Sequence, residues 1–235
     1  RRQRQMCIRD RYEDIGNSLD QFNKENLNTS LVRYYDGGSP TALWAVRSLG
    51  INPSDGRELF LTKEGTYTFE YDTEDEVVVG NSEPKLEGVL GSTLYWKGFS
   101  FSLYFRYSLG ADVFTEATYN KVENISLAGL KSNQDKRALH DRWQKPGDHA
   151  KFKGISLTET TPISSRFVLR ENYIKAESIS VGYDFESQAV QKLGIQSLRL
   201  QANTTDLFRI SSIKEERGIE YPFARSFSFS LSAMF

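Results

Sequence analysis

Two segments of this sequence sort apolar and polar side chains onto opposite sides of an extended backbone. In residues 99–108, FSFSLYFRYS, the odd positions carry Phe, Phe, Leu, Phe and Tyr, whereas three of the five even positions are serine. Residues 224–235, ARSFSFSLSAMF, repeat this pattern and end on an aromatic residue, Phe235. Because successive side chains of a β-strand point to opposite faces, such alternation predicts strands rather than helices.

The same alternation recurs along the C-terminal half and predicts an antiparallel, all-β fold. The expected strands are 86–96, 99–109, 170–185, 197–208 and 224–235. The connections between them hold two, about 60, about 11 and about 15 residues, so short and long connections alternate. Outer-membrane barrels combine short turns on one side with long loops on the other, and their tilted strands need about 9–11 residues.

One expected strand, 170–185, changes phase along its length. Its apolar residues Ile179 and Tyr183 are odd-numbered, whereas Ile174 and Ala176 are even-numbered. This change predicts a β-bulge near Ala176, or a strand that continues beyond the membrane.

Composition excludes several classes of function. The net charge is -1, which predicts no nucleic-acid partner, and the mean hydropathy of -0.52 comes without any apolar run long enough for a membrane helix. Hydropathy does not detect transmembrane strands, because their alternation averages to a polar value. Cys7 is the single cysteine and lies far from His140 and His149, so neither a disulfide nor a metal site is expected.

Alternation alone fits two architectures, a soluble β-sandwich and a transmembrane β-barrel. Three features favour the barrel. The apolar faces hold consecutive Phe residues with Trp96, Tyr107 or Tyr183 at their ends, as in an interfacial aromatic girdle. The polar faces carry mostly Ser, Thr, Asn and Gln. Five strands would leave two open edges, which a bilayer does not tolerate, so the strands are expected to be part of a larger closed barrel.

The N-terminal region divides differently. Residues 1–11, RRQRQMCIRDR, resemble the translated remnant of a sequencing adapter and are expected to be non-native; a basic arm that binds lipid or nucleic acid is the alternative. Residues 12–85 are expected to form an extracellular loop region, with a short amphipathic helix at 14–26 and a β-pair within 66–80. Residues 86–235 then hold the transmembrane strands and their loops.

Six motifs resemble the C-terminal part of the SusC/RagA family of TonB-dependent outer-membrane transporters, in the right order and with the right spacing. They are WAVRSLGINPSDGRELFLTKEG (44–65), VVVGNSEPKLEG (77–88), RWQKPGD (142–148), SSRFV (164–168), ENYIKAESISVGYDF (171–185) and YPFARSFSFSLSAMF (221–235). The similarity is nearly continuous from about residue 14. It implies an all-β antiparallel transmembrane barrel of 22 strands with an N-terminal plug, of which this chain would supply about five C-terminal strands.

The resemblance also implies a location, an activity and partners. It places the protein in the outer membrane of a Gram-negative cell as a multi-pass barrel that imports oligomeric nutrients, either glycans or peptides. The implied partners are a SusD-like surface lipoprotein, the TonB complex acting through an N-terminal region, outer-membrane lipid, and the barrel-assembly machinery, which would read Phe235 as an assembly signal. No cofactor and no enzymatic activity are implied. A soluble carbohydrate-binding β-sandwich module remains the alternative.

Four aromatic residues of the expected loops are candidates for contact with a ligand, because aromatic rings stack on sugars and on apolar peptide side chains. They are Tyr34, Tyr35, Trp44 and Trp143. Packing within the loops, or contact with the lipoprotein partner, is the alternative role.

Arginines on the polar faces of the expected strands are candidates for the lumen, where they would contact the plug. They are Arg106, Arg199 and Arg225. No pair of carboxylates, nucleophile with a base, or phosphate-binding loop indicates catalysis. A barrel enzyme would need an inward nucleophile beside a base, and neither histidine lies on an expected strand. The acidic run 72–76 lacks the glycine of a calcium-binding loop and is expected to be a solvated turn.

Overall fold

The computed structural model of the protein forms two compact units. It describes residues 11, 31–127, 129–131, 133–156, 158–185, 192, 194–213 and 225–235. The first unit comprises the described parts of Arg1–Glu83 and Asp112–Leu169, and the second those of Pro84–Ala111 and Arg170–Phe235. The helix expected at 14–26 and the first ten residues lie outside the described residues.

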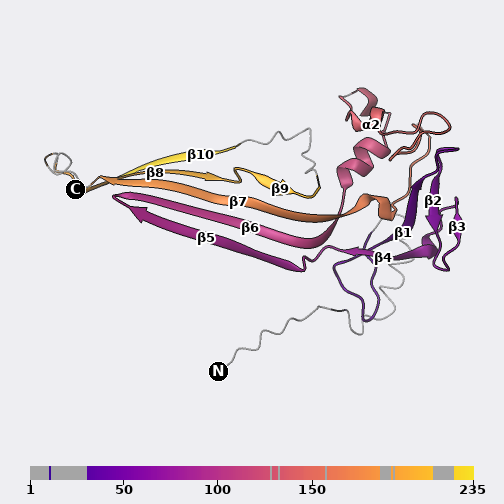
Figure 1. The fold of residues 1–235 in the computed structure, drawn as a ribbon, viewed down its shortest axis with the longest axis horizontal. Coiled ribbons are helices and arrows are strands. Elements are labelled where there is room, and N and C mark those ends of the chain that lie inside the picture. Colours follow the sequence, from indigo (N-terminus) through magenta and orange to yellow (C-terminus); the bar gives the residue numbers. More distant parts are fainter. Residues whose placement is uncertain are drawn as a thin grey trace. The chain divides into compact units, whose positions relative to one another are not determined.

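The second unit is an antiparallel sheet of long strands (Figure 1). Its elements are β5 (Leu86–Trp96), β6 (Phe99–Phe114), β7 (Val168–Phe185), β8 (Ser197–Thr205), β9 (Arg209–Ser211) and β10 (Phe227–Met234). The strand order is β10-β8-β7-β6-β5, with β9 also paired to β7. The five expected strands are therefore present, in an all-β arrangement that matches the fold class expected from the sequence.

The β5–β6 hairpin has the turn that its sequence predicts. Lys97 and Gly98 both have positive φ, 46° and 84°, as a two-residue turn between twisted strands requires. The register then runs without a shift from Trp96↔Phe99 to Leu86↔Leu109. Beyond the expected end at 109, β6 continues to Phe114. Its residues from Asp112 onward belong to the first unit, where Phe114 packs against a cluster of buried side chains.

The irregularity expected near Ala176 is present, but the extra residue lies in the β8–β9 segment that pairs with β7. β7 pairs Ser178 with Thr205 of β8, and Lys175 with Arg209 of β9. Two residues of β7 therefore oppose three residues of the β8–β9 segment. The backbone of Asp206 absorbs this mismatch with a φ of 48°. β8 therefore ends at Thr205, before the expected end at 208, and pairing with β7 resumes in β9 from Arg209.

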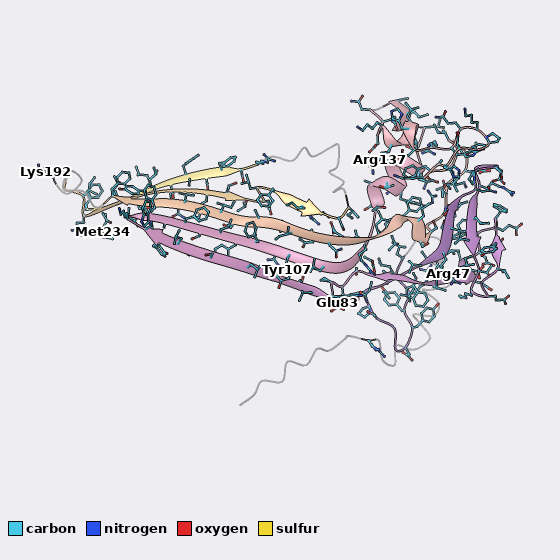
Figure 2. All side chains as sticks on the ribbon, in the orientation of Figure 1. Arg47, Glu83, Tyr107, Arg137, Lys192 and Met234 are labelled. Atoms are coloured by element: carbon cyan, nitrogen blue, oxygen red, sulfur yellow. The ribbon has the colours of Figure 1, made fainter. Side chains whose placement is uncertain are left out.

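Apolar and polar side chains occupy separate faces across β7, β8 and β10. Phe229 and Val181 flank Ala202 in register, while Ser230 and Gly182 flank Gln201. Side chains project from both faces along this sheet (Figure 2). Phe229 is 75% exposed, so the apolar face is open to its surroundings.

The first unit contains a small sheet and several short helices. Its strands are β1 (Ala42–Ile51), β2 (Glu58–Leu61), β3 (Tyr67–Thr68) and β4 (Glu76–Asn81), in the order β3-β2-β1-β4. Its helical elements are η1 (Thr73–Asp75), η2 (Thr118–Glu123), η3 (Gly129–Lys131), α2 (Arg137–His140) and η4 (Ser165–Phe167). Across the described residues, no helix has both the length and the apolar character needed to cross a membrane.

The β-pair expected within 66–80 does not form between the two halves of that segment. β3 pairs with β2, and β4 pairs with β1, because η1 turns the chain away after β3. β1 pairs with β2 on one edge and with β4 on the other, and its Ala45 and Val46 are completely or almost completely buried. A second cluster of buried side chains comprises Val122, Ala138, Phe152 and Phe167.

Candidate functional site

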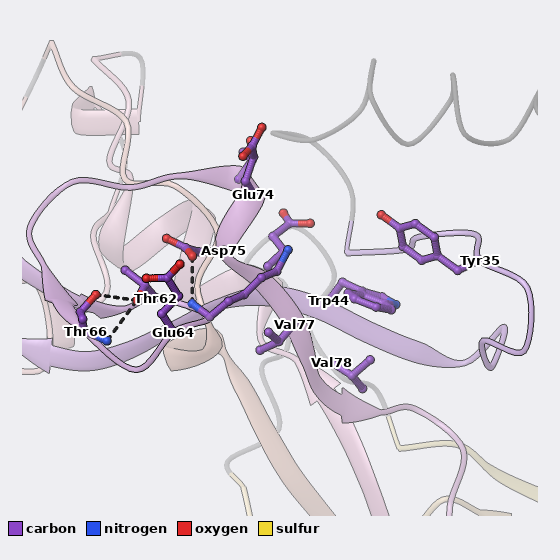
Figure 3. Close-up of a pocket in the computed structure, with 12 residues that line it drawn as sticks. Tyr35, Trp44, Thr62, Glu64, Thr66, Glu74, Asp75, Val77 and Val78 are labelled. Carbon is purple, nitrogen blue, oxygen red and sulfur yellow. Dashed lines mark hydrogen bonds between the residues drawn. The ribbon is translucent and has the colours of Figure 1, made fainter.

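An open cavity of about 1040 Å³ lies in the first unit (Figure 3). It is lined by β1, the turn between β2 and β3, η1 and β4. Its lining residues are Tyr35, Trp44, Thr62, Lys63, Glu64, Thr66, Thr73, Glu74, Asp75, Glu76, Val77 and Val78.

One wall of the cavity is aromatic. The ring centroids of Tyr35 and Trp44 lie 5.2 Å apart, with the planes tilted by 51°. Trp44 is held by β1, and its backbone N–H donates to the carbonyl of Leu31 at 2.8 Å. Tyr35 precedes a turn closed by the Gly38 N–H, and it remains 43% exposed. The structure thus brings together two of the four aromatic residues that the sequence analysis selected (Figure 3).

The opposite wall is acidic and is fixed by hydrogen bonds to the backbone. Asp72 caps η1, with its Oδ1 accepting from the Glu74 N–H at 2.9 Å. Asp75 Oδ1 accepts from the Lys63 N–H at 2.9 Å, which fastens the β2–β3 turn to η1. Thr62 and Thr66 close that turn through their hydroxyl groups, 2.8 Å apart. The acidic segment 72–76 is therefore a hydrogen-bonded turn in which Asp72 and Glu74 are exposed and Glu76 is buried.

A buried ion pair adjoins this wall. Arg33 Nη2 donates to Glu76 Oε1 at 2.8 Å and lies 2.7 Å from Oε2, and the two side chains are only 1% and 8% exposed. Burial raises the pKa of Glu76, and Arg33 opposes that rise. The hydrogen bond goes to Oε1, so within the described chain Oε2 has an ionic contact but no hydrogen-bond donor. Burial and the charge of Glu76 also raise the pKa of Tyr71.

Trp143 lies at a different place in the first unit. Its indole Nε1 donates to the Pro53 carbonyl at 3.0 Å, and its ring covers Gly56, where a Cβ would lie 2.5 Å from Cδ2. Trp143 also lines a second cavity of about 210 Å³ together with Asp55 and Glu159. Tyr34 is partly buried and does not line either cavity.

A charged cluster around Arg166 ties three elements together, and alternation in the sequence gave no sign of it. Arg166 Nη2 lies 2.9 Å from Glu58 of β2 and 2.9 Å from Glu123 of η2. The Ser164 hydroxyl also donates to Glu58, at 2.6 Å. The motif SSRFV supplies Ser164, Arg166 and the buried Phe167, so its role in this unit is structural. Among the described residues, no group of His, Cys, Asp or Glu side chains could hold a metal ion.

Comparison with solved structures shows the fold. A structure of the RagAB peptide transporter matches 76% of this chain with a TM-score of 0.63 and 16% identity, using 20% of its own chain. The RagAB peptide importer in its open-open state matches 78%, with a TM-score of 0.63 and 17% identity, again over 20% of its chain. No family model matches the sequence.

Comparison with curated proteins finds two TonB-dependent receptors. TonB-dependent receptor P39 of Formosa agariphila is 24% identical over 161 residues, which are 67% of this chain and 15% of the relative. This chain matches part of a SusC/RagA-like TonB-dependent receptor. TonB-dependent receptor P3 of the same organism is 25% identical over 173 residues, 74% of this chain and 16% of that receptor. The SusC/RagA-like chain thus spans about one sixth of the length of these curated relatives.

In the sheet of this SusC/RagA-like chain, two of the three selected arginines have carboxylate partners. Arg106 Nε and Nη2 donate to Glu177 at 2.7 and 2.9 Å. Arg199 Nε lies 3.0 Å from the carboxylate of Asp184, which is directly opposite it in the β7–β8 register. The sequence analysis did not select either acid, although Asp184 and Arg199 follow from pairing the strands in register. Arg225 is exposed just before β10, and Phe235 is 79% exposed just after it.

Proposed function

We propose that this chain is a portion of a TonB-dependent transporter that imports oligomeric nutrients across the outer membrane of a Gram-negative cell. The observation that carries the proposal is the sheet of the second unit, which keeps apolar residues in register on one exposed face, in a chain whose fold matches part of RagAB. A large exposed apolar face on an antiparallel sheet requires lipid or another apolar cover. In this proposal lipid covers it, and the polar face lines the lumen.

The two units have different roles in this proposal. Residues 86–235 supply transmembrane strands, about five of the 22 expected for the whole barrel, together with their loops. Residues 12–85 and the long connection after β6 form a region outside the membrane that contacts cargo. The compact packing of Asp112–Leu169 with the N-terminal part of the chain supports a common role for these segments. Arg106, Arg199 and Arg225 face the lumen, and their interactions position the plug.

The cargo is a peptide or a glycan. The solved neighbours are described as peptide transporters or importers, and the curated relatives are described as receptors. These descriptions name no enzyme, which is consistent with a protein that has no catalytic role. A SusD-like lipoprotein, the TonB complex and the barrel-assembly machinery, which reads Phe235, are the proposed partners.

The proposal is tested by deleting the gene of the complete receptor and measuring uptake of fluorescent oligopeptides and oligosaccharides by whole cells. Uptake of at least one class should be lost in the deletion strain and restored by the intact gene. It should also stop when a protonophore removes the energy that TonB transmits. Unchanged uptake in the deletion strain would refute import by this protein. A complete gene product that stays monomeric in buffer without detergent would instead favour the soluble carbohydrate-binding module.

A further inference from the structure

The cavity of about 1040 Å³ joins two kinds of surface that recognise one kind of ligand. The aromatic wall presents Tyr35 and Trp44, whose tilted rings are 5.2 Å apart. Aromatic faces attract a cation placed within about 6 Å of the ring centre. The acidic wall, on η1 and the β2–β3 turn, lies in the same cavity (Figure 3).

The charges of the lining residues are unbalanced. Four carboxylates line the cavity, from Glu64, Glu74, Asp75 and Glu76, against one ammonium group, that of Lys63. Arg33 neutralises Glu76 through the buried ion pair, so a charge of about -2 remains for the cavity at neutral pH. A cavity of this sign concentrates cations and repels anionic oligomers.

Glu76 supplies an independent indication of a ligand. Its side chain is only 8% exposed, yet it lines the cavity, and its Oε2 has an ionic contact with Arg33 Nη2 at 2.7 Å but no hydrogen-bond donor within the described chain. Buried carboxylate oxygens normally have such donors, because leaving one without a donor costs free energy. An ammonium or guanidinium group carries several N–H donors and no acceptor, so it complements both this oxygen and the acidic wall.

We propose that this cavity is a subsite for a lysine or arginine side chain of an oligopeptide. The apolar stem and the cationic head of that side chain contact the rings of Tyr35 and Trp44. The head group donates hydrogen bonds to Glu74, Asp75 and Glu76. The inference rests on the proposed import of oligomers and specifies the charge of the cargo, because neutral sugars also stack on aromatic rings but gain nothing from the acidic wall.

The test measures binding by calorimetry to the complete receptor purified in detergent. The probes are a hexapeptide of alternating alanine and lysine, its counterpart with glutamate, and a neutral hexasaccharide of glucose. The lysine peptide should bind most tightly. Its affinity should fall in about 1 M salt, where the Debye length is only about 3 Å.

Variants separate the two walls. Tyr35→Ala should weaken binding of the lysine peptide about fivefold, through loss of the ring contact. Replacing Glu64 and Glu74 together by Gln should weaken it about tenfold, since each exposed pair contributes up to about fivefold. Tyr67→Ala and Glu70→Gln are matched controls, because both residues are exposed in the same unit and neither lines the cavity. These controls should leave the affinity unchanged.

Three outcomes would overturn the inference. They are equal affinity for the lysine and glutamate peptides, unchanged affinity in both cavity variants, and tighter binding of the hexasaccharide that depends on Tyr35 but not on salt. The whole-cell uptake assay distinguishes a failure of the proposed subsite from a failure of the proposed function. If cells import oligomers but binding shows no preference for cations, only the subsite is wrong. If cells import nothing while purified receptor still binds the lysine peptide through Tyr35, only the transport proposal is wrong.

Discussion

Arg33 and Glu76 form an ion pair that is almost wholly removed from solvent, with Arg33 Nη2 2.8 Å from Glu76 Oε1. The pair links the segment before β1 to the first residue of β4. Removing one charge of a buried pair destabilises a fold, because the remaining buried charge keeps the desolvation cost without the attraction. The pair therefore holds Glu76 at the cavity that it helps to line.

Replacing Arg33 by Met should open the β1–β4 region. We expect a loss of about 3–5 kcal/mol in the local free energy of opening, as is typical when one partner of a buried pair is removed. Hydrogen–deuterium exchange of the β1 and β4 amides in the complete receptor measures this loss. Arg57→Met is the control, since Arg57 and Asp55 form an exposed pair. Similar exchange in the two variants would show that burial of the Arg33 pair is unimportant.

The stability of the first unit should depend on pH through Glu76. Burial raises the pKa of this carboxyl group, so the folded chain holds its proton at a pH where the unfolded chain has lost it. The resulting stabilisation is complete below the unfolded pKa and is lost as the pH rises through the folded pKa. Glu76→Gln should remove this dependence. The pH dependence is measured as the resistance of the complete receptor to a protease, at pH values from below the unfolded pKa to above the folded pKa of Glu76. The variant is measured in the same way, and parallel curves would show that Glu76 does not cause the dependence.

Gly56 and Gly65 separate backbone strain from contact with Trp143. Both have positive φ, 73° and 87°. A Cβ added at Gly56 would lie 2.5 Å from the Trp143 ring, whereas a Cβ added at Gly65 would meet no heavy atom within 4 Å. Gly65→Ala should cost only the strain of a left-handed conformation, about 1–2 kcal/mol. Gly56→Ala should cost more and should also displace the indole from Pro53.

Limited proteolysis of the receptor with trypsin measures the displacement of Trp143. Lys151 and Lys153, which lie near Trp143 in the sequence and are not followed by proline, should be cleaved faster in Gly56→Ala than in Gly65→Ala. Equal rates in the two variants would mean that Trp143 does not depend on its contact with Gly56.

The two faces of the sheet should differ in their tolerance of charge. Phe101→Arg and Phe229→Arg should cost about 2–4 kcal/mol where these residues lie near the middle of the bilayer, because the arginine would face lipid. Ser102→Arg and Ser228→Arg should be milder, because the opposite face lines an aqueous lumen in the proposed barrel. The fraction of receptor assembled in outer membranes, judged by its heat-dependent mobility in gels, measures the effect. Equal assembly of both sets would show that the faces are assigned wrongly.

The long strands could be predicted from sequence because alternation is a local property. Within each strand of the second unit, the order of apolar and polar residues shows which side chains share a face. The turn at Lys97 and Gly98 fixes the register between β5 and β6. For the ring pair of the cavity, the sequence predicted the two residues but not their contact. Tyr35 and Trp44 were selected as loop aromatics, but their contact depends on β1 and on the turn that Gly38 closes.

The sequence alone therefore determined the class of fold, the two faces of the sheet and the resemblance to TonB-dependent receptors. Only the tertiary structure decided the partners of β3 and β4, the position of the bulge opposite Ala176, and the cluster in which Arg166 meets Glu58 and Glu123. The reason is physical: alternation follows from the backbone of one strand. The ion pairs join residues 43 to 108 positions apart, and β1 pairs with β4 across 30 to 39 positions. No periodicity within a single segment predicts these partners.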